Sequence, residues 1–347
     1  MSKWLLLFIF LTPLTAVAQY TITGKIVNAD TRQPVADASV YLSNASAGAK
    51  STADGSFTIT GVRGGQYDLV VSIVGFTIYH QTVMVNNNIS IPDIAIAHQV
   101  TMLKEVRIGP DKHWAEHFEE FKKQFLGTTD NAEQCKILNP HALDFDYDSE
   151  QNELTATASA ALIIQNKALG YKITYQLNSF TMNYRSGQLY FDGAAFFEDL
   201  KGGSHAVKRW KANRQQVYQG SLMHFLRSII ANKVAEEGFT PRRLIRKLDP
   251  AYHGFGNKYV ETLVTTVLSV GEYAHTTDVK GEYAMGFNDC LYVMYKDQQL
   301  GASIITIDAP YAYFDNNGIV INPHDVVMEG VWGQSRMAEM LPVDYEP

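Results

Sequence analysis

The sequence predicts a mainly β protein with two parts, an N-terminal β-sandwich and a C-terminal α+β domain built on antiparallel sheets. Its 347 residues suggest about two domains, because one domain usually takes roughly 100 to 200 residues. The 19 Tyr, 17 Phe and 4 Trp residues favour half-buried strands. With 46% hydrophobic and 19% charged residues and a net charge of −7, the chain can build cores, which argues against disorder and against a coiled coil.

Short runs rich in Val, Ile, Thr and Tyr alternate with turn signals in the first part of the chain. Asp54-Gly55 suits the positive φ values of a tight hairpin turn. Tyr67, Leu69, Val71 and Ile73 fall on one face of the strand over 67–73. Asp68 and Ser72 fall on the other face, which Val70 leaves partly apolar. The pattern indicates that one face of this strand packs on a second sheet. The expected strands are 20–27, 38–43, 56–60, 66–74, 77–85 and 89–96.

Several short motifs follow one another in this region. They include Thr31-x-x-Pro34-Val35, Thr52-x-Asp54-Gly55-x-Phe57-x-Ile59, Gly65-x-Tyr67-x-Leu69 and Gly75-Phe76. Over residues 19–107 this order resembles the carboxypeptidase-regulatory-like domain, a transthyretin-type sandwich. That resemblance implies a non-catalytic domain, often found before the plug of glycan-importing TonB-dependent receptors in the outer membrane of Gram-negative bacteria.

The segment after the sandwich is similar to a TonB box of those receptors. It reads Leu103-Lys104-Glu105-Val106-Arg107-Ile108-Gly109, and Arg107 departs from the receptor pattern. The rest of the chain is too short for a plug and a large barrel. We therefore favour the interpretation that this segment is the last sandwich strand leading into a linker.

Residues 108–347 are predicted to form the α+β domain. Trp114, Phe118, Phe121 and Phe125 recur with helical spacing after Pro110-Asp111, which predicts an amphipathic core helix. A second helix is expected from about residue 221 to 238. This region resembles the uncharacterised part of short exported proteins that carry the same sandwich, which implies no activity. Expected strands are 153–159, 171–177, 180–184, 188–191, 259–270, 282–287, 291–295 and 303–307, with a hairpin turn at 315–318 and a short helix near 332–342.

The first eighteen residues predict export. Lys3 precedes an apolar stretch over 4–14, and Ala16-Val17-Ala18 before Gln19 has the form of a signal-peptidase site. The stretch is shorter than the ~20 apolar residues of a spanning helix, and no later run is long enough. The expected location is therefore the periplasm or the outer-membrane surface, with no transmembrane helix and no nucleic-acid partner.

His113-x-x-Glu116-His117 is the first candidate for chemistry. Two imidazoles one helical turn apart could ligate zinc, with the Glu as a base, as in the inverzincin peptidases. The motif lacks a third ligand in a matching context, and both histidines fall at the edge of the apolar face of the predicted helix. We therefore favour structural or solvated histidines, and we expect no metal and no cofactor.

Three alternating carboxylates, Asp144, Asp146 and Asp148, fall on one face of a predicted strand. They could hold calcium, but an exposed strand face with Phe145 and Tyr147 turned inward is favoured. The cysteines at positions 135 and 290 could form a disulfide in an oxidising compartment, and the sequence leaves this open.

A basic island, which we define as residues 201–235, contains no Asp or Glu. Such a patch could hold phosphates or uronates of envelope lipids and glycans, with Trp210 as a stacking partner. The alternative is a solvated surface that pairs with the acidic runs 116–120 and 144–153. The candidate ligand-binding residues are Lys208, Arg209, Trp210, Lys211 and Arg214. Other cations of the island and its extension are Lys201, Arg227, Lys233, Arg242, Arg243, Arg246 and Lys247.

These observations together favour an exported, non-catalytic binding or assembly module of the cell envelope. Its partner would be a glycan, an envelope lipid or an outer-membrane protein. The competing hypothesis is a zinc-dependent, peptidase-like hydrolase in the C-terminal domain.

Overall fold

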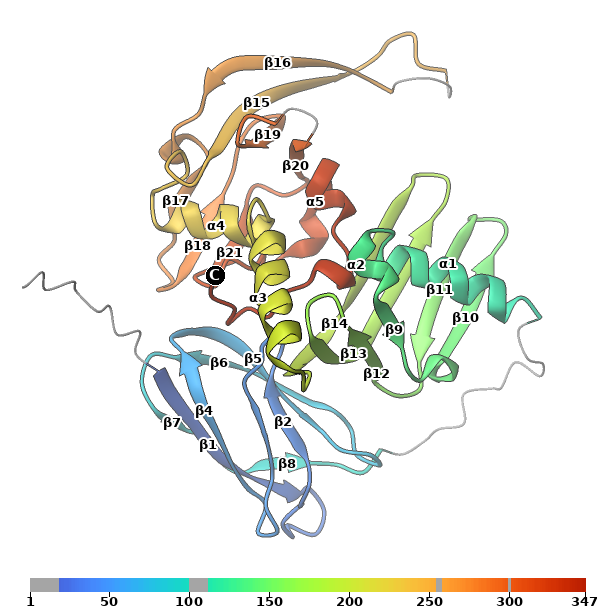
Figure 1. Cartoon of the computed structure of the whole chain (residues 1–347), viewed down its shortest axis with the longest axis vertical. Coiled ribbons are helices and arrows are strands. Elements are labelled where there is room, and N and C mark those ends of the chain that lie inside the picture. The colour runs from blue at the N-terminus through green and yellow to red at the C-terminus, as the bar shows by residue number, and fades with distance from the viewer. Residues whose placement is uncertain (1–18, 100–111, 254–257, 299–300) are drawn as a thin grey trace, which may run out of the picture.

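The computed structural model describes residues 19–99, 112–253, 258–298 and 301–347. They form an N-terminal sandwich and a larger C-terminal region with two main sheets, each with its own helices and core (Figure 1). The predicted architecture, a β-sandwich followed by an α+β region with antiparallel sheets, is confirmed. No helix in the described ranges is long and apolar enough to cross a membrane.

The sandwich consists of two four-stranded sheets. Alternating side chains from both sheets meet between them, and Ile22, Leu42 and Ile59 are fully buried there. The six expected strands are present, except that 89–96 is divided into two short strands. One sheet contains β1 (Gln19–Asn28), β4 (Ser56–Arg63), β7 (Ile89–Ser90) and β8 (Ile94–Ile96), and the other contains β2 (Ser39–Leu42), β3 (Gly48–Lys50), β5 (Gly65–Ser72) and β6 (Tyr79–Val85).

A six-stranded sheet follows the sandwich and is organised around one long strand, β13 (Tyr171–Asn183). One edge of β13 pairs with β14 (Gln188–Asp199) along its whole length, and the other edge pairs with β11 and β12. We expected two strands, 171–177 and 180–184. Both belong to β13, because the pairing with β14 continues on each side of a register shift between Leu177 and Ser179. The other strands are β9 (Cys135–Ile137), β10 (Leu143–Asp148), β11 (Glu153–Ala158) and β12 (Leu162–Asn166).

Helix α1 (Trp114–Leu126) packs on this sheet through Phe121 and Phe125, which are fully buried in its core. The short helix α2 (Asp130–Glu133) follows. Helix α3 (Ser204–Tyr218) comes after β14 and was not predicted, because few of its residues are apolar. The expected amphipathic core helix is thus present in α1, beginning at Trp114.

The last part of the chain forms a five-stranded and a three-stranded sheet. Helix α4 (Leu222–Ile230) buries Phe225 and Leu226 in their core. It ends earlier than predicted, since Asn232 has a left-handed backbone with φ of 52°. The five-stranded sheet contains β15 (Phe239–Leu248), β16 (Tyr259–Val267), β19 (Cys290–Tyr295), β20 (Ser303–Ile307) and β22 (Val326–Glu329). The three-stranded sheet contains β17 (Ala274–Thr276), β18 (Glu282–Met285) and β21 (Ala312–Asp315). Helix α5 (Gly330–Gln334) follows β22.

The sandwich and the C-terminal region are in direct contact. The Asn44 N–H donates to the carbonyl of Ala195 in β14 at 2.7 Å. The tail, residues 341–347, also reaches the sandwich, where Val343 joins the core and donates its N–H to the Asn44 carbonyl at 2.7 Å. The tail therefore links the sandwich to the rest of the molecule.

Three predicted features lie outside the described residues. They are the signal peptide 1–18, the segment 103–109 that is similar to a TonB box, and the helix start at Pro110-Asp111.

Candidate functional site

Helix α3 carries all five candidate ligand-binding residues, but it turns them in different directions. Trp210 is only 7% exposed, and its indole N–H donates to the Lys167 carbonyl at 2.9 Å. Gly170 and Gly202 make room for the ring, because a Cβ at either position would lie within 2.5 Å of a ring carbon. Trp210 therefore anchors α3 to the six-stranded sheet, which corrects its predicted role as a stacking partner for a ligand.

Arg214 is a second anchor of α3. Its Nε donates to the Leu169 carbonyl at 2.7 Å, and one Nη donates to the Gly170 carbonyl at 3.2 Å. The same Nη pairs with Asp199 at 2.6 Å, and the guanidinium lies 3.7 Å from the centre of the Tyr171 ring. These contacts occupy Arg214 in fixing the helix.

The other three candidates, Lys208, Arg209 and Lys211, are exposed on the outer face of α3. We call these three residues the α3 face. None of them forms an ion pair with a residue in the described ranges. The alternative of pairing with the acidic run 116–120 is not observed either, since Glu119 and Glu120 pair with lysines of their own helix.

A groove of about 510 Å³ separates α3 from the tail. Lys211 and Arg214 stand on the α3 side, and Ser46 and Asp344 on the other. Asp344 accepts hydrogen bonds from the backbone N–H and the hydroxyl of Ser46. The groove therefore has charges of both signs, and Lys211 is the cation at which it meets the α3 face.

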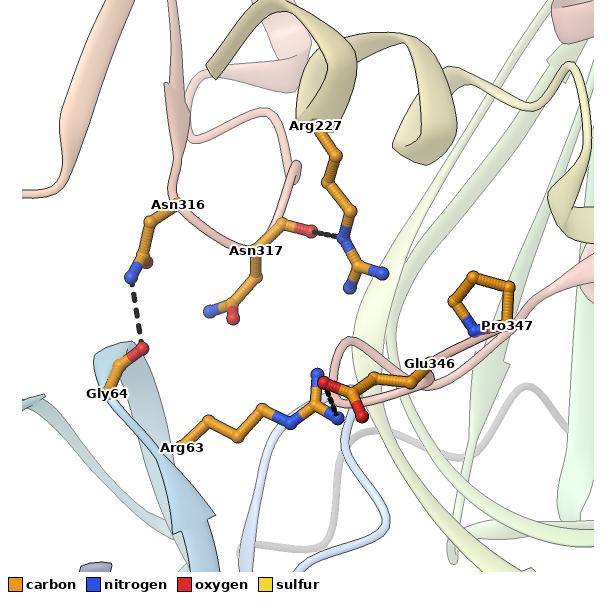
Figure 2. Close-up of a pocket in the computed structure, with 7 residues that line it drawn as sticks. All are labelled: Arg63, Gly64, Arg227, Asn316, Asn317, Glu346 and Pro347. Atoms are coloured by element: carbon orange, nitrogen blue, oxygen red, sulfur yellow. Dashed lines mark hydrogen bonds and ion pairs between the residues drawn. The ribbon is translucent and has the colours of Figure 1, made fainter. Parts of the chain in front are cut away.

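A second hollow, which we call the junction cavity, lies where the sandwich, α4, the turn after β21 and the tail meet (Figure 2). Its volume is about 460 Å³. The sequence predicts a hairpin turn at 315–318, but nothing in its local pattern indicates that this turn lies beside Gly64 and Gly65 of the sandwich. The cavity is lined by Arg63, Gly64, Arg227, Asn316, Asn317, Glu346 and Pro347.

Arg227 fixes the wall of the junction cavity and holds the tail. Its Nε donates to the Asn317 carbonyl at 2.9 Å, and its two Nη atoms donate to the carbonyls of Tyr345 and Val343, both at 2.8 Å. All three acceptors are backbone atoms far from Arg227 in the sequence. Local sequence pattern carried no signal for this role.

The turn after β21 approaches the sandwich closely. Asn316 Nδ2 donates to the Gly64 carbonyl at 3.0 Å, and a Cβ at Gly65 would lie 2.9 Å from Asn317 Nδ2. The nearby Tyr67 hydroxyl is buried without a hydrogen-bond partner among the described residues. Burial, and secondarily the charge of Asp344, raises the pKa of Tyr67 to about 12.

The metal-binding hypothesis gains no support from the geometry. His113 precedes α1 and its Nδ1 lies 3.0 Å from a Glu116 oxygen, and both side chains are exposed. The His117 ring contacts Phe145 and Tyr147. Within the described ranges no group of three or more His, Cys, Asp and Glu side chains could hold a metal ion.

The remaining candidates are also resolved. Asp144 and Asp146 lie on the exposed face of β10 and Phe145 packs toward the core, as predicted. The expectation that Tyr147 also turns inward was wrong, because its side chain is 43% exposed. Cys135 and Cys290 are free thiols in different sheets, so the disulfide does not form. Burial raises the pKa of Cys135 to about 12.

Comparison with known families identifies the sandwich. Residues 22–108 match the family model of the CarboxypepD_reg-like domain, which confirms the resemblance found in the sequence. The comparison with curated proteins gave no match.

Comparison with solved structures found similarities of limited extent. A pilus 2b backbone protein of group B streptococcus is 20% identical over 23% of this chain and 42% of its own, with a TM-score of 0.20. A type II cohesin–X-dockerin complex from Acetivibrio cellulolyticus is 18% identical over 30% of this chain and 74% of that chain, with a TM-score of 0.22. A DUF3823 family protein from Bacteroides ovatus is 12% identical over 54% of this chain and 83% of its own, with a TM-score of 0.20. At these TM-scores we draw no conclusion from them.

Proposed function

We propose that this chain, whose residues 22–108 match the CarboxypepD_reg-like domain, is an exported, non-catalytic binding or assembly module of the cell envelope. In this proposal the α3 face binds an anionic group of an envelope glycan, lipid or outer-membrane protein. The sandwich and the six-stranded sheet provide the rigid support on which the helix is displayed.

One observation carries this proposal. Lys208, Arg209 and Lys211 have no carboxylate partner among the described residues, whereas neighbouring Arg214 is paired and hydrogen-bonded. Cations that are exposed together without counter-charges on the helix attract anionic surfaces over a Debye length. The anchors Trp210 and Arg214 keep the helix in place when the face is occupied.

Export is part of the same proposal. The charged residue, apolar stretch and Ala-Val-Ala site in residues 1–18 support cleavage between Ala18 and Gln19. An intact mass measured on protein from envelope fractions tests this point, because retention of residues 1–18 would contradict it.

The binding proposal is tested by co-sedimentation of the purified protein with isolated Gram-negative envelopes. Two double variants are compared. The test variant carries Lys208→Glu and Lys211→Glu, and the control variant carries Lys50→Glu and Lys280→Glu. The second pair makes the same change in net charge at exposed positions that are not on α3. We expect the α3 variant to lose at least about 30-fold in affinity, since each Lys near an anionic surface contributes about 1 kcal/mol. Equal losses in both variants would contradict a site on α3.

A further inference from the structure

We propose that the junction cavity binds a hydroxylated organic anion of monosaccharide size, with uronic acids as the representative class. This inference does not rest on the α3 face, although the groove beside Lys211 shares Glu346 and Pro347 with the cavity. The volume of the junction cavity, about 460 Å³, falls within the range of small-molecule sites, which are commonly found where domains meet.

Two guanidinium groups make the cavity suitable for an anion. The three Arg227 hydrogen bonds go to backbone carbonyls, which carry no net charge. Arginine has five N–H donors, so these three bonds leave two for a ligand. Arg63 supplies the second cation from the opposite wall (Figure 2).

Arg63 now pairs with Glu346 of the tail. The Glu346 side chain is 54% exposed and that of Arg63 is 22% exposed, so the carboxylate lies at the rim of the cavity. Exposed ion pairs contribute little net stability, and a ligand carboxylate can therefore replace Glu346 at low cost. A planar carboxylate can also take both donors of the guanidinium fork.

The amide side of the cavity supplies a contact for hydroxyl groups. Asn317 is more than nine-tenths buried, and Figure 2 shows its side-chain amide reaching into the space toward Arg63. Its Nδ2 donates to Asp315 at 3.1 Å, which fixes the orientation of the amide and leaves its oxygen as the acceptor. A ligand with a carboxylate and adjacent hydroxyls would thus match both the arginines and the amide.

The test is calorimetric titration of the full-length mature protein with D-glucuronate, D-glucose and inorganic phosphate. We expect saturable binding of glucuronate that is tighter than that of the other two. Arg63→Gln should weaken glucuronate binding about 10- to 100-fold, as expected for one hydrogen-bonded charge. Glu346→Gln should strengthen it by up to about fivefold, because it removes the competing carboxylate.

The gain in Glu346→Gln separates a binding role from a loss of structure, since damaged protein does not bind more tightly. The proposal is overturned if glucuronate shows no saturable binding, or if glucose or phosphate binds as tightly. It is also overturned if Glu346→Gln gives no gain. Loss of glucuronate binding in Lys208→Glu, Lys211→Glu, with binding intact in Arg63→Gln, would place the anion on α3 instead.

Discussion

Replacement of Arg214 by Ala should destabilise the protein strongly, although it removes one charge from a cationic surface helix. The side chain is only 14% exposed, and it donates hydrogen bonds to the carbonyls of Leu169 and Gly170. Hydrogen bonds of charged groups contribute about 1.5 to 3 kcal/mol each. Stacking on Tyr171 adds about 1 kcal/mol. The pair with Asp199 adds little, because that carboxylate is 75% exposed.

These contributions are not additive, so we expect a loss of about 3 to 4 kcal/mol in the free energy of unfolding. Urea unfolding followed by circular dichroism measures it as a shift in midpoint at constant slope. Lys211→Ala is the matched control on the same helix and should change stability by less than about 0.5 kcal/mol. A loss below about 1 kcal/mol for Arg214→Ala would refute the role of Arg214 as an anchor.

Two further predictions concern other parts of the molecule. Phe121→Ala, at a fully buried position, should lower the free energy of unfolding by about 3 to 5 kcal/mol. His117→Ala should leave both folding and envelope association nearly unchanged. This would be contradicted if the wild type bound one equivalent of zinc and the His117 variant lost it. Burial lowers the pKa of His224 below its usual 6.5, aided by the charges of Lys296 and Arg227 and opposed by Glu237. The folded state then binds fewer protons than the unfolded state, so stability is complete above about pH 6.5 and falls as the pH drops toward the lowered pKa. In His224→Gln this part of the pH dependence should disappear from unfolding curves measured between about pH 5 and 7, and an unchanged dependence would show that other groups cause it.

Much of the sandwich could be predicted because its signals are local. The alternation in β5 and the Asp54-Gly55 turn depend only on neighbouring residues, and Gly55 has the expected positive φ of 79°. The sequence predicts two strands on either side of Asn178, a residue type that is depleted in strands, where the structure has the single strand β13. Its pairing with β14 on both sides of this point overrides that preference. The sequence pattern does not predict helix α3, because Trp210 and Arg214 hold this helix in place and it has no apolar stripe.

The candidate site could be predicted only in part. The sequence located a cluster of cations, but it could not separate Arg214 from Lys211, because that difference depends on carbonyls 44 and 45 residues away from Arg214. The roles of Arg63 and Arg227 were likewise inaccessible. Their partners are in the tail, and Arg227 reaches carbonyls 116 and 118 residues away.

The most direct test of the central claim measures envelope association and unfolding midpoint on the same samples of wild type and of Lys208→Glu, Lys211→Glu. We predict that wild-type association fades as salt shortens the Debye length from ~10 Å at 0.1 M toward ~3 Å at 1 M. The variant should lose association at every salt concentration and keep its unfolding midpoint, because exposed charges contribute little to folding. A lowered midpoint with salt-independent, undiminished association would contradict the claim that the α3 face is a binding surface.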